Sequence, residues 1–196
     1  MCSNFRPRLI LASASPRRQK LLKQIGLDFE IIPSSIDETV PPGVAPDVAA
    51  VKLAENKAID VARRLKDGIV IAADTVVALD DSILGKPKDE EEARKMLERL
   101  SGRWHRVFTG IAVIDSSSSK KVTDYEESRV KFKNLSSVEI ENYIRTGEPM
   151  DKAGAYGIQG KGALLVEKIE GCYYNIVGLP LFRLSLVLSH FGVKIL

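Results

Sequence analysis

The sequence is poor in the residues that build disulfide frameworks and zinc sites. Its 196 residues include two cysteines, Cys2 and Cys172, and two histidines, His105 and His190. Because Cys2 lies next to the chain end, we expect no structural disulfide, and this cysteine content fits a reducing compartment such as the cytoplasm. The two histidines are far apart in the sequence, which disfavours a zinc site.

Long apolar runs and an excess of one charge are also missing. No apolar run approaches the roughly 20 residues that a membrane-spanning helix needs, and the N-terminal region lacks the apolar core of a signal peptide. The net charge of +3 is too small to indicate binding to nucleic acid or to a membrane surface. We therefore expect neither nucleic acid nor a membrane as a partner.

The chain does have the composition of a globular protein, with 44% hydrophobic and 28% charged residues. No linker divides it, so we expect one domain over residues 1–196. The patterns predict an α/β protein with a mixed sheet flanked by helices, bilobed, with a central cleft. Strands are expected at 8–12, 28–33, 69–79, 106–115, 121–133, 163–169 and 173–178, and helices after Ser15 and at 47–66, 89–100, 136–147 and about 180–191.

Several of these helices carry start signals. Asp89 with Glu92 three residues later predicts a capped start, and Ser136 with Glu139 predicts a capping box. Asp47 is the expected N-cap of the long helix over 47–66.

The first expected helix begins in an unusual way. In "LILASASPRRQKLL", a short apolar strand leads through a Ser/Ala turn to Ser15, a possible N-cap, and Pro16, which suits the first helical position. Arg17 and Arg18 follow, where the helix dipole is positive and each cation costs a few tenths of a kcal/mol. The pair predicts a negatively charged ligand close to this helix end.

Asp74 interrupts "IVIAADTVVAL", a run typical of a strand that is buried on both faces. A buried carboxylate costs several kcal/mol unless it is paired or metal-bound. If the strand ends at residue 73, Asp74 lies at the sheet rim where α/β proteins bind ligands. The alternative, a carboxylate that only ties down a turn, stays equally open from the residues alone.

Further charged residues are individually ordinary but suggestive together. Glu38 lies beside Asp37 in a polar loop, Lys57 lies on the long helix and Lys86 lies in a Gly-Lys-Pro turn. Taken singly, each is expected to be solvated. A polyphosphate with Mg²⁺ is the ligand that needs cationic and acidic groups at once.

Five stretches, in this order and spacing, resemble the Maf family of nucleoside triphosphate pyrophosphatases over about residues 8–192. They are "LILASASPRRQKLL", "IAADTVV", "ILGKP", "LSGRWHRVFTG" and "EPMDKAGAYGIQG". The resemblance implies a fold like that of inosine triphosphate pyrophosphatases and a homodimer. It also implies hydrolysis of a nucleoside triphosphate to the monophosphate and pyrophosphate with a divalent metal, Mg²⁺ or Mn²⁺.

The resemblance also implies roles for individual residues. "DKAGAYGIQG" is similar to the branch that acts on dTTP and UTP, and Asp74 matches its proton acceptor. Substrate selection is implied for Arg17, Thr75 and Gln159, and phosphate or metal handling for Ser13, Arg18, Glu38, Lys57 and Lys86, with Glu38 and Asp74 as the metal ligands.

Other functions remain as competing hypotheses. The strongest is a non-catalytic nucleotide-binding regulator of septum formation, a role with which the Maf family has been linked. An aspartate-nucleophile phosphatase would need acids after the first strand, and residues 8–15 contain none.

Overall fold

The computed structural model describes residues 7–41, 43–80 and 82–196, and within them the chain builds one seven-stranded sheet. The strand order is β2-β1-β3-β5-β6-β7, with β4 paired to β3 outside this path. The strands are β1 (Leu9–Leu11), β2 (Glu30–Ile31), β3 (Ile69–Leu79), β4 (Ser82–Leu84), β5 (Trp104–Asp115), β6 (Lys121–Phe132) and β7 (Val166–Glu170).

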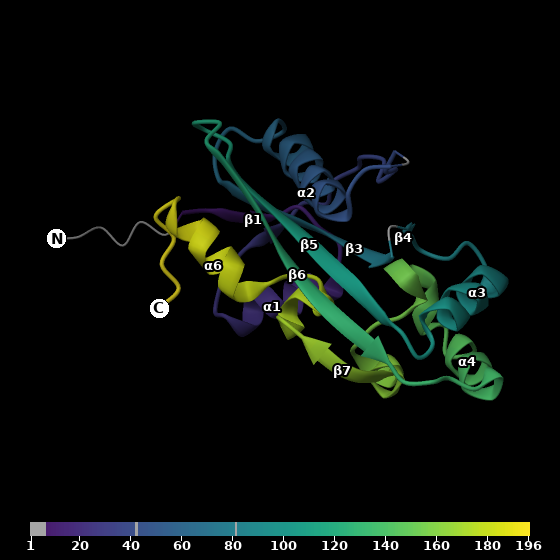
Figure 1. Cartoon of the computed structure of the whole chain (residues 1–196). Helices are drawn as coiled ribbons and strands as arrows, with labels where there is room; N and C mark the ends of the chain where they lie inside the picture. The colour runs from purple at the N-terminus through teal and green to yellow at the C-terminus, as the bar shows by residue number, and fades with distance from the viewer. Residues whose placement is uncertain (1–6, 42, 81) are drawn as a thin grey trace.

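The helices gather around the two ends of this long sheet (Figure 1). Helices α1, α2 and α6 surround one end, and α3 and α4 lie at the other. The α-helices are α1 (Pro16–Gln24), α2 (Pro46–Ala62), α3 (Glu90–Leu100), α4 (Ser137–Ile144), α5 (Tyr173–Val177) and α6 (Leu181–Ser189). Three 3₁₀ turns, η1 (Glu148–Asp151), η2 (Ala153–Ala155) and η3 (Gly160–Leu165), follow α4 within the described residues.

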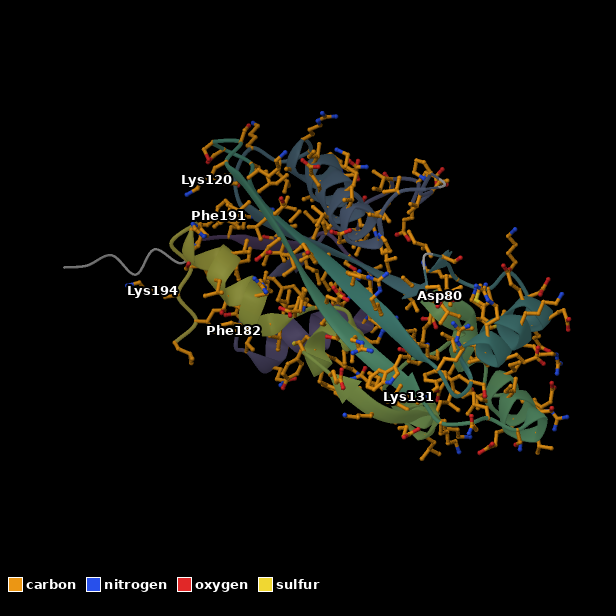
Figure 2. The ribbon with its side chains drawn as sticks, in the orientation of Figure 1. Asp80, Lys120, Lys131, Phe182, Phe191 and Lys194 are labelled. Carbon is orange, nitrogen blue, oxygen red and sulfur yellow. The ribbon has the colours of Figure 1, made fainter. Side chains whose placement is uncertain are left out.

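The sheet is mixed, as the sequence predicts. Strand β1 runs parallel to β2 and β3, whereas β3–β4, β3–β5, β5–β6 and β6–β7 are antiparallel. At the far end of the β5–β6 hairpin, the Lys120 ammonium lies 5.2 Å from the ring centroid of Phe191, just beyond α6 (Figure 2). This cation–π contact joins the hairpin tip to the C-terminal segment.

Strand β3 is the centre of the core, because both of its faces are covered. Its even-numbered residues, such as Ala72 and Val76, pack with residues of α2. Its odd-numbered residues divide into two groups: Ala73 packs with α1 and α6, and Val77 packs with α3 and α4. Between these two groups lies Thr75, the one residue of β3 that is not fully buried. The break between the two apolar clusters is therefore where a cavity can open.

Helix α2 approaches the sheet closely at Gly110 of β5. A Cβ atom at this position would lie 2.3 Å from the backbone of Ala50, far inside contact distance. Gly110 is also the register partner of Asp74. Glycine is required here because no side chain fits between the strand and the helix.

Several local predictions hold. The Asp89 side chain accepts a hydrogen bond from the backbone N–H of Glu92, and Ser136 and Glu139 form the expected capping box. The two long strands and the helices after Asp89 and Ser136 are also found where the sequence places them.

No described helix is both long enough and apolar enough to span a membrane.

Other local predictions are wrong. Helix α2 begins at Pro46 with Ala45 as N-cap, so Asp47 lies in its first turn, and the helix ends at Ala62. Ser15 holds the N-cap position of α1, but its side chain makes no capping bond. The strand expected over 28–33 is reduced to β2.

Cys2 lies outside the described residues, and Cys172 is a free thiol.

The largest error concerns the segment after β6. The strand expected over 163–169 begins as η3 and becomes β7 only at Val166, and the strand expected over 173–178 is helix α5. Its Tyr-Tyr-Asn-Ile-Val sequence has high β-propensity. Tertiary bonds of Asn175 and a left-handed C-cap at Gly178 override that propensity.

His105 lies in a buried aromatic cluster between β5, β6 and the segment after η2. Its Nε2 is 2.7 Å from the Tyr156 hydroxyl, and its ring meets Phe132 and Tyr156 edge-on at centroid distances of 5.0 and 5.2 Å. The side chain is 2% exposed, and this burial lowers the pKa of His105 to about 4.

This burial predicts acid sensitivity. The unfolded chain binds a proton at His105 near pH 6.5, but the folded chain does so only near pH 4. Stability is therefore complete above pH 6.5 and falls by up to about 3 kcal/mol as the pH drops toward 4. Denaturation of His105→Gln, which keeps a polar group for Tyr156, should show a flatter pH profile in this window. The exposed His190→Gln variant is the control, and a His105→Gln profile as steep as wild type would contradict the prediction.

Candidate active site

The cavity beside Thr75 has a volume of about 440 Å³ and draws its walls from both ends of the sheet. The turn from Ala12 into α1 forms one side, and the segment around Asp151–Tyr156 forms another. Eight of the residues that the sequence assigns to the site line it: Ser13, Arg17, Arg18, Glu38, Lys57, Asp74, Thr75 and Lys86. The structure thus brings together residues that are far apart in the sequence.

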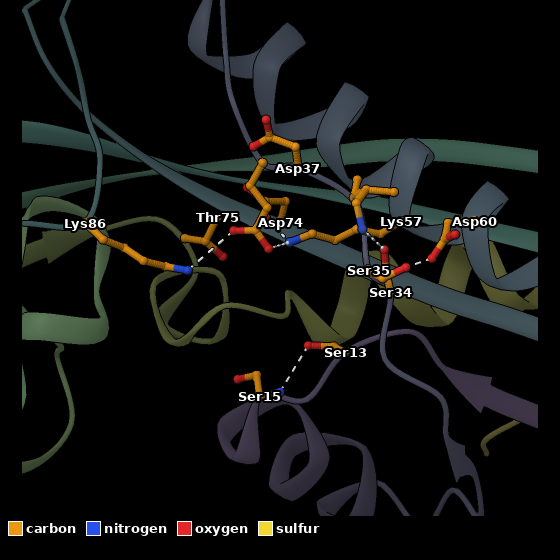
Figure 3. A network of polar contacts seen from close by, with 12 residues as sticks. Ser13, Ser15, Ser34, Ser35, Asp37, Lys57, Asp60, Asp74, Thr75 and Lys86 are labelled. Carbon is orange, nitrogen blue, oxygen red and sulfur yellow. Dashed lines mark hydrogen bonds and ion pairs between the residues drawn. The ribbon is translucent and has the colours of Figure 1, made fainter. Parts of the chain in front are cut away.

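Strand β3 has the bounds expected for it, Ile69–Leu79, so Asp74 lies within the strand and not at the sheet rim, where it would lie only if the strand ended at residue 73. Because side chains alternate along a strand, Asp74 points toward α2, whereas Thr75 points to the opposite face. Helix α2 meets the carboxylate with Lys57, whose Nζ is 2.5 Å from Asp74 Oδ1 (Figure 3). Both side chains are buried, so the ion pair offsets the desolvation of each charge.

Lys57 also binds a second carboxylate. Its Nζ is 2.6 Å from Glu38 Oε1, and Lys86 Nζ reaches Glu38 Oε2 at 3.4 Å. Partial burial opposes ionisation of Glu38, but the ion pairs with Lys57 and Lys86 outweigh it and lower the pKa of this carboxyl. Ion pairs therefore hold the loop that carries Glu38 against α2, and cations and anions alternate along the cavity wall. Asp37, the neighbour of Glu38, instead accepts hydrogen bonds from Thr39 within the loop.

Arg18 is bound in a different way, by neutral oxygen atoms. Its Nε donates to the Gly178 carbonyl at 2.8 Å, Nη1 to Ser13 Oγ at 3.3 Å and Nη2 to Thr75 Oγ1 at 3.2 Å. Desolvation lowers the pKa of this guanidinium, although Asp74 nearby acts in the opposite direction. A partly buried cation whose bonds go to neutral groups is a favourable partner for an incoming anion.

The start of α1 completes this wall. Ser13 Oγ accepts from the backbone N–H of Ser15 at 3.2 Å (Figure 3), and Arg17 lies 3.5 Å from the Asp151 carboxylate. The two arginines therefore differ: Arg18 turns inward against neutral groups, and Arg17 pairs with an acid on the opposite wall.

Gln159 is the one predicted site residue that the structure does not bring into this cavity. It is exposed and lies outside the lining residues, although its neighbour Ile158 is among them. Asp151, Lys152 and Tyr156 also line the cavity, although the sequence alone does not indicate them as site residues. They fall in the "DKAGAYGIQG" stretch, but nothing in their spacing distinguishes them from loop residues.

The family model described as "Maf-like protein" matches residues 8–191. The chain belongs to the Maf family. It is 50% identical over 193 residues to the dTTP/UTP pyrophosphatase of Caldicellulosiruptor saccharolyticus, covering 96% of this chain and 97% of that one. It is 54% identical over 188 residues to the dTTP/UTP pyrophosphatase of Clostridioides difficile, covering 95% and 97%.

A solved structure also supports the fold of this Maf protein. A HAM1 protein from Coxiella burnetii aligns with a TM-score of 0.55 at 17% identity, covering 94% of this chain and all of that one. Together with the mixed sheet described above, this likeness confirms the predicted fold class.

The buried ion pair predicts an asymmetric effect of substitution in this Maf chain. Lys57→Met leaves Asp74 charged and unpaired in the interior, so we expect a loss of about 3 kcal/mol in the free energy of unfolding. Adding Asp74→Asn should recover part of that loss, because the unpaired charge is gone. Urea denaturation measures both.

The control for this prediction is Lys52→Met on the exposed side of α2, where the lysine pairs with Glu55 at 3.0 Å. It should change stability by about 0.5 kcal/mol or less. If Lys57→Met costs no more than Lys52→Met, the buried pair does not stabilise the fold.

Proposed function

We propose that this Maf protein is a nucleoside triphosphate pyrophosphatase that hydrolyses dTTP and UTP to the monophosphate and pyrophosphate. One observation supports it most: the same cavity wall carries Arg18, bound by neutral groups, and the buried Asp74 carboxylate held by Lys57. An anion-binding cation and a fixed base are what hydrolysis of a phosphoanhydride requires. The names of the relatives supply the two substrates.

Asp74 is the proposed general base. Water attacks the α-phosphorus, a new P–O bond forms, and the bond from that phosphorus to the bridging oxygen of the β-phosphate breaks. The proton of the water passes to Asp74 and then to solvent, and the electron pair leaves with pyrophosphate. Lys57, at 2.5 Å from Oδ1, fixes the carboxylate in place. A base of this kind contributes roughly 10²–10⁴-fold to the rate.

The cations divide the binding of the triphosphate. Arg18 uses three of its five N–H groups on Gly178, Ser13 and Thr75, so two remain for phosphate oxygens. Lys86, which is largely exposed and pairs with Glu38 at 3.4 Å, can turn toward the ligand. An arginine offers a bidentate fork and a lysine a single mobile charge.

Glu38 and Asp74 are the proposed ligands of a divalent metal, Mg²⁺ or Mn²⁺. Their carboxylate oxygens converge on one positive group, the Lys57 ammonium, at 2.6 and 2.5 Å, so they fit a hard cation. The described residues contain no group of three or more His, Cys, Asp or Glu side chains placed to hold a metal. This fits Mg²⁺, which binds one or two carboxylates and completes its shell with substrate phosphates and water. A bound ion would withdraw charge from the phosphates.

Substrate selection is proposed for Arg17, Thr75 and Gln159. Gln159 offers a donor and an acceptor, which match the N3–H and carbonyl edge of uracil and thymine. Since it is exposed outside the cavity wall, it would act on a base that projects from the cavity mouth.

A cytoplasmic homodimer is proposed as the working form.

The activity is tested by incubating the purified chain with dTTP or UTP and Mg²⁺ and measuring pyrophosphate. We expect pyrophosphate release, and at least a hundredfold loss in Asp74→Asn with an unchanged far-UV spectrum. The matched control is Asp89→Asn, which makes the same change at an exposed aspartate. Release of orthophosphate alone would indicate a phosphatase, and tight nucleotide binding without turnover would favour the regulator of septum formation.

The two arginines at the start of α1 are expected to differ in their effects. Arg18→Ala removes a phosphate-facing cation and should raise KM about tenfold for every nucleotide alike. Arg17→Ala should instead alter the ratio of kcat/KM between dTTP or UTP and the other nucleotides. Lys20→Ala, on the exposed side of α1, is the control. Equal effects of both arginine variants across a nucleotide panel would refute this division.

A further inference from the structure

A chain of hydrogen bonds runs behind the cavity wall, from Thr75 through the buried Thr109 to helix α5. Thr109 on β5 is the register partner of Thr75, is 0% exposed, and has its hydroxyl oxygen 2.9 Å from that of Thr75. The same oxygen is 2.9 Å from the backbone carbonyl of Asn175. Thr109 is not among the residues that line the cavity, so it can affect a ligand only through its neighbours.

The direction of each hydrogen bond follows from the Asn175 carbonyl, which can only accept. Thr109 has a single hydroxyl proton and donates it to this carbonyl, so Thr75 is the donor in the Thr75–Thr109 bond. Thr75 Oγ1 consequently has no proton left and acts as an acceptor toward Arg18, whose Nη2 donates to it at 3.2 Å. Because each bond polarises the next, Thr75 becomes a better acceptor for the guanidinium.

Helix α5 anchors the other end of this chain. Asn175, 0% exposed, donates through Nδ2 to Ser128 Oγ and to a β5 carbonyl, both at 2.9 Å. Ser128 Oγ in turn bonds the backbone N–H and C=O of Cys172 at 2.9 and 3.0 Å. At the end of α5, the Gly178 carbonyl accepts from Arg18 Nε. Helix α5 is therefore attached to β5 and β6, and holds Arg18 from a second side.

We propose that Thr109 is a positioning residue, backed by Asn175, that orients Arg18 for a polyphosphate by fixing the direction of the Thr75 hydroxyl. The identity of that polyphosphate, a nucleoside triphosphate, rests on the function proposed above. Without the Thr109 hydroxyl, nothing fixes the direction of the Thr75 proton, and the Thr75 oxygen is no longer polarised as an acceptor. One of the three bonds that orient the guanidinium is then weakened.

The test replaces Thr109 with valine, which has the same shape but no hydroxyl. In Thr109→Val, KM for dTTP and the dissociation constant of inorganic tripolyphosphate should each rise about tenfold. The change in kcat should stay within about twofold, since Asp74 and Lys57 are untouched. Thr109→Ser, which keeps the hydroxyl, should restore both constants. The control Thr123→Val makes the same change at an exposed position of β6 and should alter neither.

A double-mutant cycle separates this role from a structural one. Since Thr109 reaches Arg18 through Thr75, Thr109→Val should weaken tripolyphosphate binding in the wild-type background but not in Thr75→Val. Equal weakening in both backgrounds would overturn the proposal, as would unchanged binding in Thr109→Val. Melting temperatures identify any variant that is unfolded at the assay temperature, in which case Thr109→Ala takes the place of the valine variant.

Tripolyphosphate binding, measured by calorimetry, needs no turnover and keeps the two proposals apart. If the wild type binds tripolyphosphate but hydrolyses no nucleotide, the proposed function fails while the binding ratios still decide the role of Thr109. If the wild type releases pyrophosphate and Thr109→Val matches it in KM and binding, only the role of Thr109 fails.

Discussion

The alternation of side chains along β3 is the constraint on which the candidate site depends. Two polar residues in succession, Asp74 and Thr75, interrupt a buried strand and must point to opposite faces. Asp74 meets Lys57 of α2 on one face, Thr75 meets Arg18 on the other, and both pairs line the same cavity. The Asp74 carboxylate and the Arg18 guanidinium are therefore both held by protein groups before a ligand binds. Such preorganisation is the main way in which a protein lowers the cost of binding and converting charged groups.

Much of the fold could be predicted from local signals. Asp89 and Ser136 cap helices because their oxygens satisfy free backbone N–H groups nearby, and this needs no knowledge of the rest of the chain. The failures occur where distant contacts outweigh local preference. Residues 173–177 form a helix although aromatic and β-branched residues favour strands, because Asn175 bonds to β5 and Ser128 and Gly178 ends the turn. The strand over 69–79 is found as expected, but its sequence alone leaves open whether Asp74 binds a ligand or only ties down a turn, because that depends on which residues approach it from other elements.

The composition of the site was predictable in part, because the resemblance to Maf proteins indicates residues by motif. It gave Arg18, Lys57 and Asp74, which do gather at one cavity. It could not give their partners. The pairing of Lys57 with Asp74, and the bonds of Arg18 to the neutral groups of Gly178, Ser13 and Thr75, depend on distances between elements. Gln159 illustrates the same limit, since a motif fixes a position in the chain but not the direction of a side chain.

Gly110 has a role that extends beyond packing. It stands opposite Asp74 in the β3–β5 register and lets the backbone of α2 lie against β5 at Ala50. A Cβ atom there would have to move from 2.3 Å to at least the 3.4 Å of ordinary contact, so the whole helix would be displaced outward. Lys57 belongs to that helix, and the length of its side chain limits how far its ammonium can reach. The absence of a side chain at residue 110 thus sets the distance between α2 and the sheet. That distance in turn determines whether the Lys57 ammonium can contact the Asp74 carboxylate.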